Sequence, residues 1–229
     1  MRHTVANAPA FSTLDLELAA DEEIVVQPGA MVAMDTGFDL AAGFGGALTR
    51  RGGSSTIRNL LVGESLIRVC YKARRDDQRI SLAPSHPGDI VAIELTDAPF
   101  FIARGAWLAS EPRVDLSVQY AGVKGWMTST GLFLMRAKGP GLVFCTTHGG
   151  AVRRDLAAGE RFLVDNRYIV AFTADMTFEL VTVTKELGAT ALSGEGLVNR
   201  YTGPGTVIYQ TRPLQRGGGW LSILAQSIF

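Results

Sequence analysis

The chain has few of the residues that build disulfide scaffolds or metal centres. Its 229 residues include two cysteines, Cys70 and Cys145, and three histidines. Two cysteines are too few for the disulfide framework of a small secreted domain, which predicts free, buried thiols in a reducing compartment. His3, His86 and His148 lack the close spacing that a cupin or zinc site needs. We therefore expect neither a metal nor another cofactor, and we expect His86 and His148 to be turn residues.

The sequence also lacks long apolar runs and an excess of charge of either sign. A membrane-spanning helix needs about 18 consecutive apolar residues, and the best candidate, residues 220–229, is shorter. Residues 1–9 contain no apolar core of a signal peptide, so we expect a soluble, cytoplasmic protein. Basic and acidic side chains both number 22, and this balance disfavours a general attraction to nucleic acid.

Catalytic signatures are lacking as well. The sequence contains neither a Walker A motif nor a nucleophile elbow. Its glycine pairs are not followed by a predicted helix whose N-terminus would help to bind phosphate. Because no combination of nucleophile, base and orienting group is discernible, we predict a non-enzymatic protein with no catalytic residues.

The sequence does contain an internal repeat. Three segments share one pattern: Gly63-Glu64-Ser65-Leu66, Ser129-Thr130-Gly131-Leu132 and Gly194-Glu195-Gly196-Leu197. Their third positions are 66 and 65 residues apart, and a near-constant period indicates a repeat architecture. A second landmark also occurs three times, at residues 29–33, 105–109 and 167–171.

The order of these landmarks predicts where each repeat begins and ends. The repeats are expected at roughly residues 38–109, 114–171 and 178–212, and the last is completed by residues 12–33. The third repeat is thus predicted to be split between the two ends of the chain. A split repeat favours a closed arrangement in which the termini lie close together.

The segments within the repeats have the pattern of β-strands. Residues 67–72 and 114–120 alternate apolar and polar side chains, as a strand with one buried face does. Residues 90–93 and 169–172 are continuous apolar runs, which indicate strands covered on both faces. We predict one all-β domain over residues 1–229, a sandwich or barrel of three pseudo-symmetric repeats. The apolar spacing after Trp220 predicts a short C-terminal helix.

Charge is distributed unevenly along the chain. Residues 50–79 carry a net charge of +5, and residues 1–49 carry a net charge of −6. One hypothesis is that the basic segment binds an anionic partner, such as RNA or a lipid headgroup. The candidate residues for this role are Arg50, Arg51, Arg74 and Arg75. The other hypothesis is that the two segments face each other within a protomer or across a subunit interface.

These motifs together resemble a known family, "altered inheritance of mitochondria, member 24". The resemblance rests on the Gly-Glu-x-Leu copies, the turn at 87–89, the Gly-Ala-Trp-Leu-Ala strand at 105–109 and the sequence motif at 203–212. It covers about residues 12–212, although the first repeat departs from the pattern in its charged turn at 74–79. The resemblance implies a β-sandwich similar to that of the tryptophan RNA-binding attenuation protein, built from three pseudo-equivalent units.

The resemblance implies less about activity. Fungal members of the family are linked to mitochondrial inner-membrane organisation, whereas bacterial members mostly lack an assigned activity. Because the chain begins without an Arg- and Ser-rich leader, it is similar to the bacterial type. The family offers no catalytic residues to transfer to this sequence.

Two classes of function remain. The favoured one is a non-enzymatic interaction or scaffold protein that works as a homo-oligomer, with a protein or membrane-surface partner. In this class the apolar C-terminal segment with Trp220 and Phe229 covers a sheet edge across a subunit boundary. The alternative is a binding module for a small ligand, RNA or anionic lipid, using a pocket on the pseudo-threefold axis or the basic segment.

Overall fold

The computed structural model describes residues 1–44, 67–96, 98–103, 105–120, 133–182 and 197–213. These residues form β-strands joined by turns, so the all-β prediction is confirmed. The landmarks at 63–66 and 129–132, most of the one at 194–197, and the predicted helix after Trp220 lie outside the described residues. Across the described segments we find no helix that is long and apolar enough to cross a membrane.

Nineteen strands are present in the described residues. In chain order they are β1 (Arg2–Ala6), β2 (Thr13–Leu18), β3 (Glu23–Val26), β4 (Met31–Met34), β5 (Asp39–Phe44), β6 (Ile67–Lys72), β7 (Gln78–Leu82), β8 (Ile90–Leu95), β9 (Phe100–Ile102), β10 (Trp107–Ser110), β11 (Asp115–Tyr120), β12 (Phe133–Lys138), β13 (Gly141–Thr146), β14 (Ala151–Leu156), β15 (Arg161–Asp165), β16 (Ile169–Thr173), β17 (Thr177–Thr182), β18 (Leu197–Thr202) and β19 (Gly205–Gln210).

The strands pair by one scheme that occurs three times. β7 lies between β2 and β4, β13 lies between β8 and β10, and β19 lies between β14 and β16. In the same way β6 lies between β5 and β3, β12 between β11 and β9, and β18 between β17 and β15. Three consecutive stretches therefore share one strand order. We call them unit 1 (β2–β7), unit 2 (β8–β13) and unit 3 (β14–β19).

An irregularity in the pairing also occurs once in each unit. The register shifts at one residue in β4, between Met31 and Ala33, where the strand pairs with β7. The same shift occurs in β10 at the residue that precedes Ala109. It occurs again in β16 at the residue that precedes Ala171. A bulge of this kind leaves one residue unpaired and bends the strand. The bulged residues are Val32, Leu108 and Val170, and they mark equivalent positions in the three units.

The units are joined by strands that cross from one unit to the next. β10 of unit 2 pairs antiparallel with β3 of unit 1, and β16 of unit 3 pairs antiparallel with β9 of unit 2. These two junctions build six-stranded sheets, in the orders β5-β6-β3-β10-β13-β8 and β11-β12-β9-β16-β19-β14. The remaining strands form a four-stranded sheet, β1-β2-β7-β4, and a three-stranded sheet, β15-β18-β17.

Each hydrophobic core extends across a junction. One core combines unit 1 side chains such as Leu16 and Ile80 with Leu108 and Phe144 of unit 2. The larger core combines side chains of units 2 and 3 and also includes Val25 of β3. Neighbouring units therefore share a hydrophobic core. The described residues pack as one continuous series of units.

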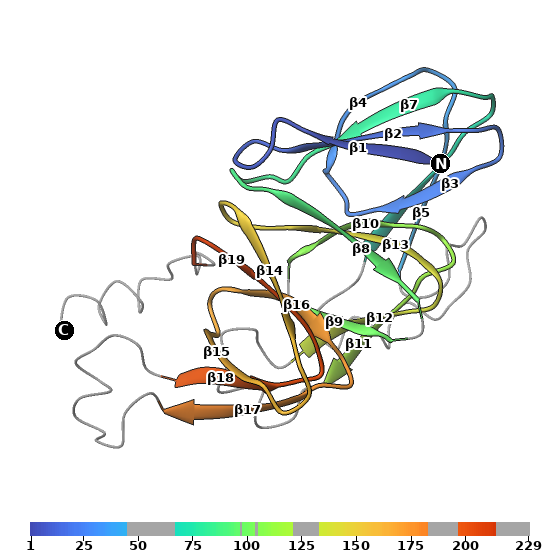
Figure 1. The fold of residues 1–229 in the computed structure, drawn as a ribbon. Helices are drawn as coiled ribbons and strands as arrows, with labels where there is room; N and C mark the ends of the chain where they lie inside the picture. Colours follow the sequence, from blue (N-terminus) through green and yellow to red (C-terminus); the bar gives the residue numbers. More distant parts are fainter. Residues whose placement is uncertain (45–66, 97, 104, 121–132, 183–196, 214–229) are drawn as a thin grey trace.

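Among the described strands the series is open at both ends, and the closed arrangement that we expected stays a prediction. Figure 1 shows β4 and β15 at opposite ends of the molecule, and they belong to different sheets. Within the described strands, no pairing joins β17–β19 to β2–β4. The pairing thus favours three consecutive units over a third repeat assembled from the two ends. The predicted repeat boundaries and the single domain over residues 1–229 stay predictions.

The turns that connect the units form a line of backbone contacts. Gly88, between β7 and β8, makes parallel bridges with Phe11 on one side and with Gly149 on the other. Ser12 N–H donates to Gly88 O at 3.1 Å, and Asp89 N–H donates to Gly149 O at 3.0 Å. A Cβ atom at Gly88 would lie 1.6 Å from the carbonyl oxygen of Thr147. Only glycine therefore permits this close approach of two backbone segments.

The contrast between two equivalent bulge positions gives a test of the fold. Leu108→Ala should lower the free energy of unfolding by about 2–5 kcal/mol, because Leu108 is fully buried and the substitution leaves a cavity. Val32→Ala at the equivalent position of β4, which is exposed in the protomer, is the matched control and, in dilute protein that is monomeric, should change it by less than about 1 kcal/mol. Urea unfolding of the two variants measures both values. Equal losses would contradict the assignment of Leu108 to a junction core.

Candidate functional site

The exposed strand β4 is the feature of the surface that stands out most. All four of its residues are exposed, and Val32 at the bulge has 61% of its surface accessible. The equivalent strands β10 and β16 are buried, with Leu108 at 0% and Val170 at 1%. The difference arises because β3 and β9 cover the outer sides of β10 and β16. Among the described strands, none covers the outer side of β4.

The composition of β4 is unusual for a free sheet edge. Natural proteins protect such edges with charged side chains, proline or very short strands. β4 reads Met31-Val32-Ala33-Met34 and contains no charge and no proline. Its exposed apolar side chains instead suit contact with another strand.

β15 is the second free edge, at the other end of the series. Leu163 in its middle is 49% exposed, whereas its neighbour Val164 is buried. The equivalent position is Val25 in β3, where the side chain is 5% exposed because β10 covers it. Among the strands that the structure describes, β15 of unit 3 has no counterpart of the partner that β3 and β9 have in units 1 and 2.

Two histidines that are 62 positions apart in sequence meet at a unit junction. The rings of His86 and His148 are stacked with their centroids 3.7 Å apart and their planes within 8°. Both do lie in turns, as predicted, but their contact was not foreseen from the sequence. Burial lowers the pKa of His86, and the nearby His148 ring lowers it further. Burial also lowers the pKa of His148.

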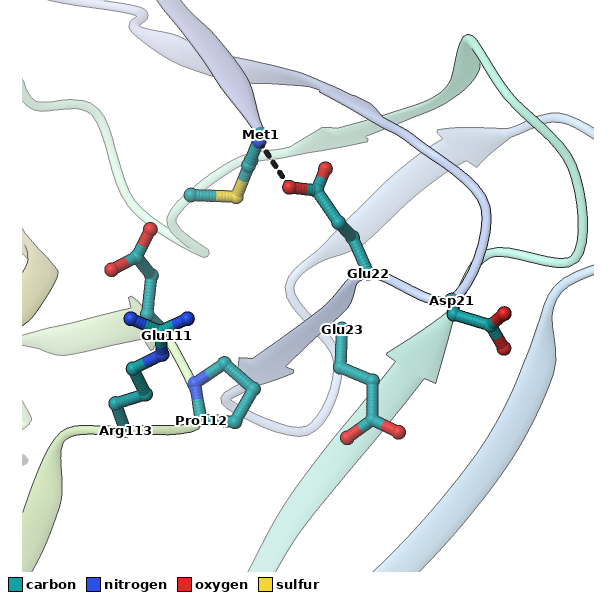
Figure 2. Close-up of a pocket in the computed structure, with 7 residues that line it drawn as sticks. All are labelled: Met1, Asp21, Glu22, Glu23, Glu111, Pro112 and Arg113. Carbon is teal, nitrogen blue, oxygen red and sulfur yellow. Dashed lines mark hydrogen bonds and ion pairs between the residues drawn. The ribbon is translucent and has the colours of Figure 1, made fainter.

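An acidic cavity lies where units 1 and 2 meet, and Figure 2 shows its lining. It has a volume of about 410 Å³ and is lined by Met1, Asp21, Glu22, Glu23, Glu111, Pro112 and Arg113. The α-amino group of Met1 donates to Glu22 Oε1 at 2.5 Å, which lowers the pKa of Glu22. Leu142 N–H donates to Glu111 Oε2 at 3.1 Å. Two of the carboxylates thus hold the local chain in place.

The carboxylate of Glu22 also serves a turn that recurs in unit 3. Ala19 N–H donates to Glu22 Oε2 at 2.8 Å, and Ala157 N–H donates to Glu160 Oε2 at 2.9 Å. These are the segments that the sequence aligns as Ala20-Asp21-Glu22 and Ala158-Gly159-Glu160. Among the described residues, no group of three or more His, Cys, Asp or Glu side chains is placed to hold a metal ion. The Glu22 carboxylate that lines the cavity thus has a structural role in this turn.

The predicted anion-binding arginines are only partly described. Arg50 and Arg51 lie outside the described residues. Arg74 is exposed in the turn between β6 and β7, and its Nε donates to Asp39 Oδ1 at 2.8 Å. Arg75 is exposed in the same turn, where its backbone N–H donates to Gln78 Oε1 at 3.0 Å. A role for these arginines in binding an anionic partner stays a prediction.

The acidic and basic segments do face each other within the chain. Lys72 Nζ lies 2.7 Å from Asp21 Oδ1, and Arg79 Nε lies 3.5 Å from Glu17 Oε2. Arg74 and Asp39 form a third ion pair, which again joins a residue of the basic segment to a residue of the acidic segment. The hypothesis of intrachain pairing is therefore confirmed for these described residues. Since the arginines are mostly exposed, water screens these pairs and each contributes little to stability.

Among the described basic residues, Arg68 fits least well with a basic surface that could bind an anion. It belongs to the basic segment but is 8% exposed, and its guanidinium donates to the carbonyl oxygen of Leu116 in β11 at 2.6 Å. Burial lowers the pKa of this guanidinium. Arg68 thus connects unit 1 to unit 2 and is not available on the surface.

The two thiols are buried and form no disulfide, as predicted. Cys70 Sγ donates to Glu23 Oε2 at 3.6 Å. Burial raises the pKa of the Cys145 thiol to about 12. A thiol with such a pKa stays protonated near neutral pH and is a poor nucleophile.

The stacked histidines predict a pH-dependent stability. Their pKa values in the folded state are lower than the usual value of about 6.5, so the unfolded chain binds more protons below that pH. The free energy of unfolding should therefore fall as the pH decreases from about 7.5 to about 5.5, and urea midpoints measure it. His148→Phe, which keeps a ring in the stack, should flatten this dependence. A slope in this variant that equals the wild-type slope would contradict the assignment.

Comparison with known proteins agrees with the fold. A family profile described as "Mitochondrial biogenesis AIM24" matches residues 3–212. An uncharacterized protein of Streptococcus pyogenes serotype M6 is 26% identical over 230 residues, which cover 96% of this chain and 90% of the relative. The crystal structure of a Streptococcus pyogenes protein is similar with a TM-score of 0.72 at 24% identity, covering 99% of this chain and 97% of that one. The expected likeness to the tryptophan RNA-binding attenuation protein stays a prediction.

Proposed function

We propose that this chain, which belongs to the mitochondrial biogenesis AIM24 family, is a non-enzymatic scaffold protein that works as a homo-oligomer. The observation that carries the proposal is the exposure of β4, whose equivalents in the other two units are buried beneath a neighbouring strand. An uncharged apolar edge favours association because its backbone groups and side chains gain partners when another strand is added. The role in membrane organisation rests on the family alone, and the proposed compartment is the cytoplasm.

The non-enzymatic part of the proposal is supported by what the described polar side chains do. Glu22, Glu111 and Glu160 accept hydrogen bonds from backbone N–H groups of turns and strands. Asp165 Oδ1 accepts the backbone N–H of Arg167 at 2.8 Å. Carboxylates engaged in this way serve to fix the backbone rather than to transfer protons.

The alternative is a binding module for a small ligand, RNA or anionic lipid at the basic turn. The exposed guanidinium of Arg75 favours it, whereas the pairing of Arg74 with Asp39 opposes it. Phosphate contacts by arginine make binding strongly dependent on salt. Retention of the protein on heparin at low salt that is lost in Arg74→Ala/Arg75→Ala would favour the alternative over the scaffold. A protein that is not retained at low salt would exclude its electrostatic form.

The scaffold proposal predicts the mass of the protein in solution. Light scattering on the full chain, over a range of concentrations, should give a mass that is a multiple of the protomer mass of 24.5 kDa. The physical reason is that two free edges at opposite ends of one protomer allow association to continue from either end. A mass that stays at one protomer at every concentration would overturn the homo-oligomeric scaffold.

A further inference from the structure

The two junctions inside the chain share one register. In the first, Ala109 of β10 is opposite Val26 of β3, and Ser110 is opposite Val25. In the second, Ala171 of β16 is opposite Ile102 of β9, and Phe172 is opposite Phe101. In both junctions, the alanine that follows the bulge is the first residue of the strand to have a partner across the junction.

A backbone hydrogen bond at the bulge completes each junction in the same way. Gln27 N–H, just after β3, donates to Leu108 O at 2.8 Å. Ala103 N–H, just after β9, donates to Val170 O at 2.8 Å. The carbonyl group of the bulged residue is therefore the acceptor in both junctions. In β4 the corresponding carbonyl group belongs to Val32.

The equivalent positions on β15 follow from the pairing inside each unit. Val26 is opposite the third residue of β6, and Ile102 is opposite the third residue of β12. Val164 is opposite Asn199, the third residue of β18. Val164 therefore occupies the position of Val26 and Ile102, and Leu163 occupies the position of Val25 and Phe101.

We infer that β4 of one copy pairs antiparallel with β15 of a second copy, with Ala33 opposite Val164 and Met34 opposite Leu163. In this register the N–H of Asp165 donates to the carbonyl oxygen of Val32, as Gln27 and Ala103 do at the internal junctions. The inference rests on the proposed homo-oligomer and names the surfaces that form it. The contact is head-to-tail, because each copy offers β4 at one end and β15 at the other.

The sheet orders explain why the partner is a second copy of this chain. Joining β4 to β15 turns the four-stranded and three-stranded sheets into the order β17-β18-β15-β4-β7-β2-β1. Apart from the extra strand β1, this is the order of the two six-stranded sheets. The chain thus carries both halves of a third junction, at opposite ends of the molecule, where they meet only between copies (Figure 1).

The other free edges do not match the two sides of an internal junction as β4 and β15 do. β5, β11 and β17 are edge strands in all three units, and β8 and β14 are edges in units 2 and 3. The internal pattern therefore provides no partner for them. Among the described strands, β4 and β15 are edges at positions where their equivalents in the other units are paired, so their pairing with each other continues the internal pattern.

The side chains at the proposed contact suit burial. Met34 is 38% exposed and Leu163 is 49% exposed. At the equivalent position of the second junction, the rings of Phe172 and Phe101 lie 5.5 Å apart between centroids. Cross-strand apolar pairs of this kind stabilise antiparallel sheets, so Met34 and Leu163 should contact each other in the same way.

Lysine substitutions test the contact without disturbing the core. Met34→Lys and Leu163→Lys each place a charge on an exposed edge, which blocks the addition of a strand. Each should reduce the mass from that of the oligomer to 24.5 kDa, while circular dichroism shows that the β-structure stays as in wild type. Leu40→Lys, on exposed β5, is the matched control and should leave the oligomer intact. If wild type is oligomeric and both edge variants keep that mass, the inference is overturned and the proposed homo-oligomer is not.

Disulfide trapping tests the register itself. Neighbouring residues on antiparallel strands have Cα atoms about 4.5–5.5 Å apart, within the range of a disulfide. Met34→Cys protein mixed with Leu163→Cys protein should give a cross-linked dimer on mild oxidation. Met34→Cys mixed with Leu40→Cys should not. A dimer from Met34→Cys protein alone would mean that two β4 strands pair with each other, which overturns the head-to-tail register.

Discussion

The pairing of strand edges is the constraint on which the rest of this structure depends. A strand whose outer N–H and C=O groups have no partner must face water or find another strand. β10 and β16 meet this requirement by pairing with β3 and β9 of the unit before them. β4 has no preceding unit among the described residues. One requirement thus joins the units to each other and, among the described strands, leaves free edges at the two ends of the series.

Which side chains are buried depends on this pairing of strand edges rather than on the residue types. Leu108 and Val32 occupy the same bulge position and are both apolar, yet one is fully buried and the other is largely exposed. Each junction contributes side chains to a core that spans two units, so the stability of a unit depends on its neighbour. The terminal units have this support on one side only. A scaffold that assembles head-to-tail would restore it on the other.

The polar groups complete the turns between and within units. Glu22 and Glu160 accept the same backbone hydrogen bond in equivalent turns, and Gly88 allows two backbone segments to approach closely. Arg68 crosses from unit 1 to β11 of unit 2. The acidic and basic halves of unit 1 neutralise each other through exposed ion pairs such as Lys72 with Asp21. Several charged side chains of the described residues thus order turns or join neighbouring segments.

Much of the secondary structure was determined by the sequence alone, because alternation with period two and apolar runs report which face of a strand is buried. Residues 67–72, 90–93 and 169–172 are strands or lie within strands as predicted, and the aligned landmarks at 29–33, 105–109 and 167–171 include the equivalent bulges. Tertiary structure alone decided that His86 stacks on His148, that Arg68 is buried, and that β4 and β15 have no partner on their outer sides among the described strands. The reason is that periodicity describes the faces of a strand, whereas neighbours along its edges come from distant parts of the chain and are defined only once the units pack.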